Sequence, residues 1–239
     1  MRVRILFDLV ACGTLVLTST GHAAQQSPAQ HGAPPPAATQ TDSVANPTLR
    51  RELLARMEQD QQARMRLIDW MRERGQGDPH QVTGDDPRLA DLRKVDQENR
   101  AWLKQLIEKS GWPGASQVGV DGAHAAWLLV QHADDAPDFQ KHCLELMRKT
   151  PPGDVSSTDV AYLTDRVMIK ETGKQLYGTQ VRLNQGKWEP LPLAEPQRVD
   201  ALRKEVQMAP LAEYLELVAK LYSGAPRGDQ PASDADKSK

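Results

Sequence analysis

Polar side chains interrupt an apolar stretch that has the periodicity of a helix, at about residues 121–132. Apolar residues cover nearly the whole helical wheel, whereas His124, Gln131 and His132 share a wedge of about 100°. Buried polar groups need partners or a ligand, so His132 is a candidate general acid or base and Gln131 a candidate ligand-binding residue. The alternative is that both histidines are structural, with the His132 cation favoured by a helix C-terminus.

An acidic and a basic residue follow each other within a second helical stretch, at about residues 157–170. Asp165 falls in a sector of apolar residues, where a carboxylate must be paired or hydrogen-bonded. In the functional interpretation Asp165 is a buried catalytic carboxylate that orients His132, and Arg166 holds an anionic group. In the structural interpretation they form an ion pair that fixes one helix to another.

Residues 175–183 alternate with the period of a β-strand. Gln175, Tyr177 and Thr179 therefore fall on one face as three hydrogen-bonding groups. Together with Gln180 they are candidate residues for binding a polar ligand. The alternative is a hairpin face that is exposed to solvent.

The sequence predicts neither a metal site nor a cofactor. Asp138 and His142 lie four residues apart on a predicted helix, but no further ligands follow at a recognised spacing. There is no nucleotide-binding loop, no Gly-x-Ser-x-Gly elbow and no Cys/His zinc pattern. The two cysteines also exclude a disulfide-rich scaffold.

The elements that must position these residues are mostly helical. A capping Asn46 and the following Pro47 predict the start of the first helix. Apolar periodicity predicts helices over about residues 47–75, 87–110, 121–132, 137–149, 157–170, 196–207 and 210–222. A turn at residues 184–187 lets the strand return as a hairpin. The fold class is mainly α, a single helical domain of about six to seven helices with one inserted β-hairpin.

The first residues have the parts of a secretory signal peptide. Arg2 and Arg4 precede an apolar run, and small residues predict cleavage near Ala23. We therefore expect residues 1–23 to be a signal peptide and the mature protein to be periplasmic or secreted. In the alternative, Cys12 is lipidated and anchors a lipoprotein to the membrane. Neither case gives the mature protein a transmembrane span.

Composition separates a folded body from two tails. Only 39% of the residues are hydrophobic, and residues 24–45 and 223–239 have few bulky apolar side chains. We expect these segments to be a disordered linker and tail on either side of a folded domain at residues 46–222. The formal net charge of -2 excludes a general attraction to nucleic acid, so the expected partner is a polar small molecule or an envelope protein.

Several short motifs occur together in one order. They are Gly-Trp-Pro, Asp-Gly-x-x-Ala-x-Trp, Gln-His-Ala-Asp, Tyr-Leu-x-Asp-Arg-Val and Gln-x-Tyr-Gly-Thr-Gln, at residues 111–113, 121–127, 131–134, 162–167 and 175–180. The set resembles an uncharacterised bacterial family, domain of unknown function 6624, over about residues 46–222. The resemblance implies no activity and no location, but the polar residues singled out above coincide with the family's motifs.

Two functions remain open at this point. The first is a binding or interaction module of the cell envelope with a polar pocket. The second is a hydrolase-like enzyme in which His132 is the acid or base, Asp165 orients it, and Arg166 and residues 175–180 hold a polar substrate. Convergence of these groups at a concave surface would favour the enzyme, whereas separation or burial would favour the module.

Overall fold

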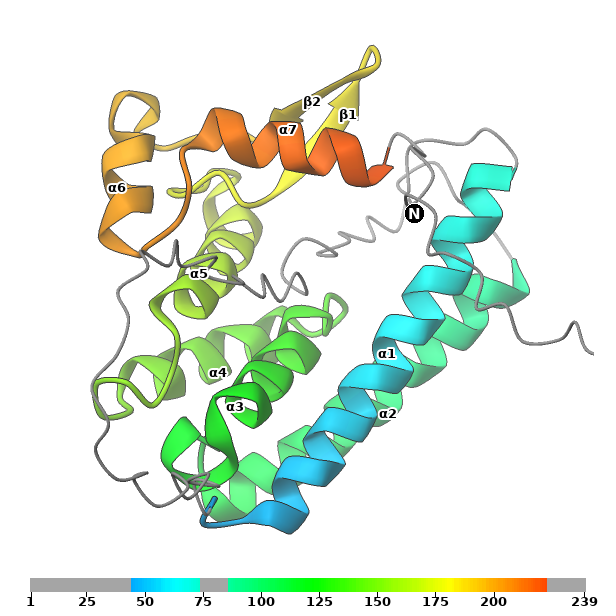
Figure 1. The fold of residues 1–239 in the computed structure, drawn as a ribbon, viewed down its shortest axis with the longest axis vertical. Helices are drawn as coiled ribbons and strands as arrows, with labels where there is room; N and C mark the ends of the chain where they lie inside the picture. Colours follow the sequence, from blue (N-terminus) through cyan, green and yellow to red (C-terminus); the bar gives the residue numbers. More distant parts are fainter. Residues whose placement is uncertain (1–43, 74–85, 223–239) are drawn as a thin grey trace, which may run out of the picture.

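The computed structural model describes residues 44–73 and 86–222 (Figure 1). Two long helices, α1 (Pro47–Glu73) and α2 (Pro87–Ser110), lie side by side along one edge of the molecule. The Asn46 side chain caps α1 by accepting a hydrogen bond from the backbone N–H of Leu49, at 3.0 Å. The expected start of the first helix is thereby confirmed.

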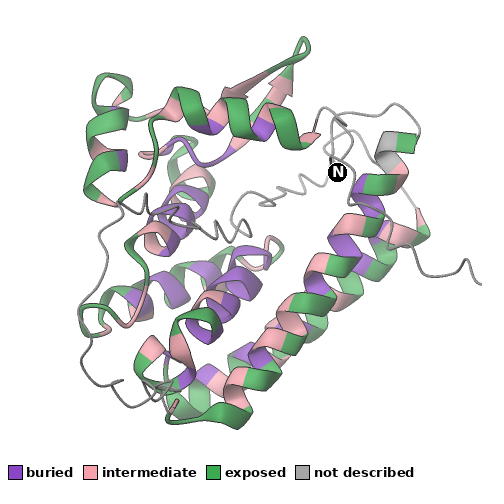
Figure 2. Cartoon of the chain, in the orientation of Figure 1, coloured by how far each residue is buried: buried purple, intermediate pink, exposed green. Residues whose placement is uncertain are grey.

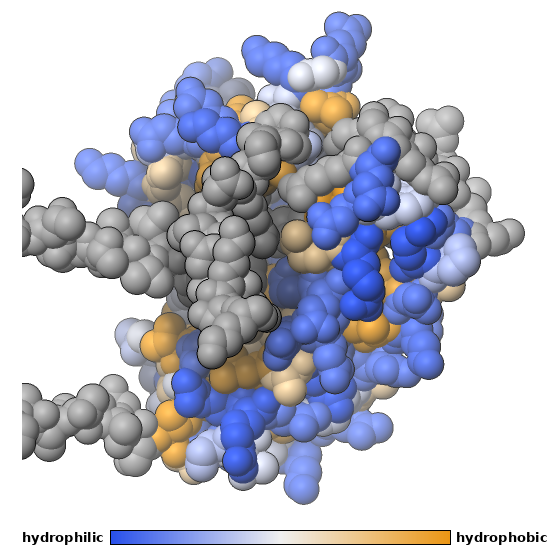
Figure 3. Space-filling model, turned by 45° about the vertical axis from the view of Figure 1, so that its right-hand side comes forward, coloured by the Kyte–Doolittle hydropathy of each residue, from blue (hydrophilic) through white to orange (hydrophobic). Residues whose placement is uncertain are grey.

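Three shorter helices form the centre of the molecule: α3 (Ala115–Gln131), α4 (Pro137–Arg148) and α5 (Ser157–Thr172). α3 packs against α1, and α4 and α5 pack against each other and against α3. Every residue of α3 from Ala125 onward is buried, as expected for a helix that is apolar nearly all round (Figure 2). The charged faces of α1 and α2 point outward, where the surface is mostly hydrophilic (Figure 3).

α3 begins earlier than the sequence predicted and contains a kink. Its first turn starts at Ala115, and Gly119 interrupts the helix with a φ of 75°. Such a φ is unfavourable for residues with a Cβ atom, which is why glycine stands there. Val120, the residue after the kink, is 76% exposed.

The C-terminal part of the described chain is a hairpin covered by a helix. β1 (Val181–Asn184) pairs antiparallel with β2 (Lys187–Pro190). A short 3₁₀ helix leads into α6 (Val199–Glu205), and α7 (Leu211–Tyr222) packs on β2.

The predicted strand over residues 175–183 is shorter in the structure, because residues 175–180 form a loop. Gly178 in this loop has a φ of 69°, which a regular strand does not contain.

The fold class is confirmed as mainly α, with one hairpin in a single helical domain. Within the two described ranges, none of the helices combines the length and the apolar character needed to cross a membrane. The predicted signal peptide, linker and C-terminal tail lie outside the described residues.

Candidate functional site

His132 directly follows α3 and is buried among charged side chains. Its ring nitrogen Nδ1 lies 2.8 Å from Asp60 Oδ2 and 2.9 Å from Arg64 Nε. Asp60 and Arg64 are one turn apart on α1, so both reach the same edge of the imidazole. Arg64 also donates to Asp96 of α2 at 2.7 Å. The Asp60, Arg64 and His132 side chains are all at least 97% buried.

A second ion pair, which involves α5, lies close enough for its carboxylate, Asp134, to act electrostatically on Asp96. Arg166, whose side chain is fully buried, forms an ion pair with Asp134, two residues after His132. Asp96 and Asp134 are the partly exposed members of the network, at 19% and 20%. His132 and Arg166 were both predicted as site residues, and the structure places them in one charged network.

Burial and neighbouring charges raise the pKa of Asp96 but lower the pKa of Asp60. Burial raises the pKa of Asp96 to about 7, and the carboxylates of Asp60 and Asp134 add to this against the opposing Arg64 guanidinium. Burial also favours the neutral form of Asp60, but His132 and Arg64 outweigh it and lower the pKa of Asp60. Asp60 is therefore the carboxylate that stays ionised.

The sequence prediction did not include Asp60, Arg64 and Asp96. A signal for the first two was present, because they continue the apolar stripe of α1 at three- and four-residue steps between Met57 and Leu67. Charged residues on such a stripe are buried with the stripe. Asp96 carries no comparable signal, because its burial depends on how α2 lies against α1.

Asp165, the residue before Arg166 on α5, belongs to a different hydrogen-bond network. Its carboxylate accepts hydrogen bonds from the backbone N–H groups of Leu176, Tyr177 and Thr179 at 2.8–2.9 Å, and from the Thr179 hydroxyl at 3.0 Å. Burial raises the pKa of Asp165 in spite of these bonds. The carboxylate that contacts His132 is that of Asp60, so Asp165 does not occupy the orienting position expected for it.

The predicted ligand-binding residues of the 175–180 loop are also engaged within the fold. The Gln175 side chain donates to the carbonyls of Gln180 and Leu191 and accepts from the Gln180 N–H. The Gln180 side chain donates to the Thr179 hydroxyl at 3.0 Å. These three residues are buried, and together with Asp165 they hold the loop in place.

Two further predicted residues contribute backbone atoms to the interior. The Tyr177 carbonyl accepts a hydrogen bond from Arg203 at 2.6 Å, and the Tyr177 side chain is half-buried. The carbonyl of Gln131 accepts one from Gln140 at 3.1 Å, at the buried end of α3. The structure thus divides the predicted set: His132 and Arg166 lie in one network, and Asp165 with residues 175–180 lies in another.

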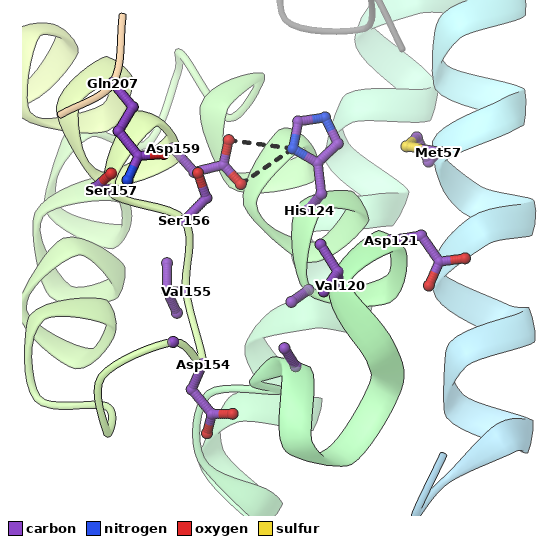
Figure 4. A pocket seen from close by; sticks show the side chains of 13 residues that line it. Met57, Val120, Asp121, His124, Asp154, Val155, Ser156, Ser157, Asp159 and Gln207 are labelled. Carbon is purple, nitrogen blue, oxygen red and sulfur yellow. Dashed lines mark hydrogen bonds and ion pairs between the residues drawn. The ribbon is translucent and has the colours of Figure 1, made fainter. Parts of the chain in front are cut away.

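A pocket of about 980 Å³ lies between α1, the kinked start of α3 and the start of α5 (Figure 4). Apolar side chains from all three parts of the chain line it, including Met57, Val120 and Val155. Five polar lining side chains lie near the start of α5: His124, Ser156, Ser157, Asp159 and Gln207. Two further carboxylates line it elsewhere, Asp121 on the side of α1 and Asp154 in the loop before α5.

An imidazole–carboxylate pair borders this pocket. His124 Nδ1 lies 3.0 and 3.1 Å from the two carboxylate oxygens of Asp159, which stands in the first turn of α5. Burial raises the pKa of Asp159, against the hydrogen bond from His124. The ring also packs on Trp127 at 4.9 Å, so its orientation is fixed and Nε2 points away from Asp159 (Figure 4).

Hydrogen bonds from the loop before α5 shape the wall of the pocket opposite His124. The carboxylate of Asp154 accepts from the backbone N–H of Ser116 at 2.7 Å and from its hydroxyl at 2.9 Å. The Asp154 carbonyl accepts from the N–H of Ala115. These bonds tie the loop to the first turn of α3 and place Val155 in the wall.

A metal is not indicated for the part of the chain that the structure describes. In residues 44–73 and 86–222, no three His, Cys, Asp or Glu side chains are grouped so that they could hold an ion. Asp138 and His142, the pair considered from the sequence, lie on the exposed side of α4.

The chain matches the sequence profile described as Family of unknown function (DUF6624) over residues 47–225. It belongs to this family. The match confirms the resemblance drawn from the motifs, and within the described part it covers all seven α-helices, the two charged networks and the pocket. No curated protein and no solved structure is detectably similar to the chain. Membership in DUF6624 therefore names a family without naming an activity.

Proposed function

We propose that this DUF6624 domain is an exported binding module of the bacterial cell envelope, and that it binds a small molecule in the pocket between α1, α3 and α5. The pocket is the observation that carries the proposal. Ligand sites are typically concavities of about 300–1,000 Å³ with apolar walls and a few placed polar groups. This pocket has that size and that division of its lining.

The side chains that border the pocket favour a neutral, hydrogen-bonding ligand. The Asp121 carboxylate is paired with Arg50, that of Asp154 with Ser116, and that of Asp159 with His124. Because these charges are balanced or hydrogen-bonded within the fold, they give little net attraction for an ion. The remaining lining offers apolar surface for a ligand body and hydroxyl and amide groups for a polar end.

Binding is favoured over hydrolysis by the separation of the predicted catalytic groups. The hydrolase-like alternative required His132, Asp165 and residues 175–180 in one concave site. Asp165 and the loop bond to each other, whereas His132 bonds to side chains of α1. The polar partner proposed for the module is therefore assigned to the pocket instead of to these residues.

Export is supported by the sequence of residues 1–23 alone. We expect the mature chain to begin at Ala24 and to be periplasmic or secreted. The intact mass of the protein after cell fractionation tests this. A mature chain that begins with a lipid-modified Cys12 would favour the membrane-anchored alternative, and an uncleaved cytosolic chain would contradict export.

Thermal-shift measurements on the full chain with a library of neutral fragments test the binding site. We expect some fragments to raise the melting temperature of the wild type, because a ligand at about 100 times its Kd stabilises by about 2.7 kcal/mol. The same fragments should not stabilise Val120→Trp, whose large ring fills the pocket from an exposed position.

A matched control uses another exposed apolar residue, Leu221→Trp on α7, which should respond like the wild type. Equal stabilisation of all three proteins would contradict the assignment of the ligand to this pocket.

A further inference from the structure

A second cavity, separate from the pocket, lies between α5, α6 and α7 (Figure 1). Its volume of about 320 Å³ falls within the range of about 300–1,000 Å³ that is typical of ligand sites. α6 supplies Arg203 to its lining, and the chain between α6 and α7 supplies Met208. α7 supplies Glu213 and Leu217. Arg203 and Glu213 are the charged members of a lining that otherwise consists of uncharged side chains.

Arg203 forms the floor of this cavity. It stands one turn after Val199 on the inward face of α6 and is 1% exposed. Its Nε donates to the carbonyl of Ala209 and its Nη1 to that of Tyr177, both at 2.6 Å. These two bonds leave Nη2 and one hydrogen of Nη1 for other acceptors.

The charge of Arg203 has no ion-pair partner within the described residues. Its guanidinium carbon lies 5.0 Å from the centre of the Tyr214 ring, and its hydrogen-bond acceptors are neutral carbonyls. Asp200 and Asp165 act on it electrostatically, but both carboxylates accept hydrogen bonds from backbone N–H groups instead. Burial accordingly lowers the pKa of Arg203. Because arginine keeps its charge at neutral pH, an anion that enters the cavity stabilises this buried cation.

Glu213 is the anion that lines the same cavity. It lies in the first turn of α7, is exposed, and has no ion pair with Arg203 or with any other residue in the described ranges. Glu213 repels a ligand that carries only a negative charge, and Arg203 repels one that carries only a positive charge. A ligand that carries both charges pairs with both side chains.

We propose that this cavity binds a free α-amino acid with an apolar side chain. The ligand carboxylate accepts hydrogen bonds from Arg203 at the floor, and the ligand ammonium group pairs with Glu213 at the exposed side. The ligand side chain packs against Met208 and Leu217, and Leu217 is 47% exposed, so binding removes apolar surface from water. The pocket between α1, α3 and α5 is a poorer site for such a ligand, because its own carboxylates are paired or hydrogen-bonded within the fold.

Isothermal titration of leucine, valine, methionine and phenylalanine into the full chain tests the proposal. Arg203→Gln removes the charge and keeps an N–H donor, so we expect it to raise the Kd of the tightest amino acid more than about tenfold. Glu213→Gln removes an exposed partner and should raise this Kd about two- to fivefold. The control Glu216→Gln, at an exposed position of the same helix, should leave it unchanged. Equal Kd values for wild type and Arg203→Gln, or no binding of any of the four to the wild type at about 10 mM, would overturn the proposal.

Two analogues of leucine separate the contributions of its charges. Isocaproate lacks the ammonium group, and isopentylamine lacks the carboxylate. We expect isocaproate to bind the wild type more weakly than leucine does and to lose no affinity in Glu213→Gln, because it has no ammonium group to pair with Glu213. Isopentylamine should not bind. Equal affinities of isocaproate and leucine would refute the contact with Glu213, and binding of isopentylamine as tight as that of leucine would refute the contact with Arg203.

A measurement on the wild type keeps the proposal testable if Arg203→Gln does not fold. In amide NMR spectra of the full chain, the added amino acid should shift signals of residues 203–217 and leave those of Val120 and Val155 unchanged. Shifts at Val120 and Val155 alone would place the amino acid in the pocket between α1, α3 and α5 and would overturn this second site.

Discussion

At the scale of single residues, the partner of a buried charge determines its role. Asp159 and Asp165 both lie on α5 and both are buried. Asp165 faces backbone N–H groups of a loop, whereas Asp159 faces an imidazole beside a pocket. The first arrangement holds the chain in place, and the second fixes a side chain that borders a cavity.

The anchoring role of Asp165 predicts a large loss of stability in Asp165→Asn. The substitution removes the charge and turns an NH₂ group toward backbone donors. We expect the free energy of unfolding to fall by about 2–4 kcal/mol, measured by urea denaturation. The control Asp91→Asn, at an exposed position of α2, should change it by less than about 0.5 kcal/mol. Equal stability of the two variants would show that Asp165 does not anchor the loop.

The two histidines predict losses of different size for the same substitution. His132→Ala leaves the buried Asp60 and Arg64 without the imidazole between them, so we expect a loss of about 3–5 kcal/mol in unfolding free energy. His124→Ala removes a ring that is 29% exposed and should cost clearly less. A larger loss for His124→Ala would reverse the roles given to the two residues.

Residue types alone found part of the site. His132 and Asp165 stood out because they interrupt apolar helical faces, with Arg166 beside Asp165, and the structure buries all three. Asp159 gave no signal, because an acidic residue in the first turn of a helix is ordinary. Its role depends on the proximity of His124, 35 residues earlier in the chain.

At the scale of elements, local signals located the helices and failed at the loop. Caps, prolines and apolar periodicity placed α1, α2, α4 and α5 to within a few residues. Residues 175–180 alternate in sequence like a strand, but the Asp165 carboxylate of α5 accepts hydrogen bonds from three of their backbone N–H groups. A tertiary partner of this kind cannot be deduced from alternation.

The kink in α3 predicts a specific sensitivity at Gly119. Its φ is 75°, and a Cβ atom there would lie 3.0 Å from the carboxylate of Asp121. We expect Gly119→Ala to lower the free energy of unfolding by about 1–2 kcal/mol or more.

Gly186→Ala in the hairpin turn is the matched control, because its φ is 79° and its Cβ would meet no neighbour. Thermal or urea unfolding of both variants separates the backbone cost from the contact. A smaller loss for Gly119→Ala than for Gly186→Ala would contradict a closely packed kink.

At the scale of the whole molecule, the pocket and the charged network share two helices. α1 supplies Met57 to the pocket and Asp60 to the network, and α3 supplies His124 to the pocket and leads directly into His132. The pocket could not be predicted from the sequence, because it forms where three segments meet that are far apart along the chain.

The proposed binding function is tested most directly by soaking crystals of the full chain with neutral fragments and solving their structures. We predict that bound fragments occupy the space between α1, the start of α3 and the start of α5, with apolar atoms against Val120 and Val155 and a polar atom bonded to His124, Ser156 or Gln207. Fragments bound only outside this pocket, or none bound at any soaking concentration, would contradict the proposed binding function.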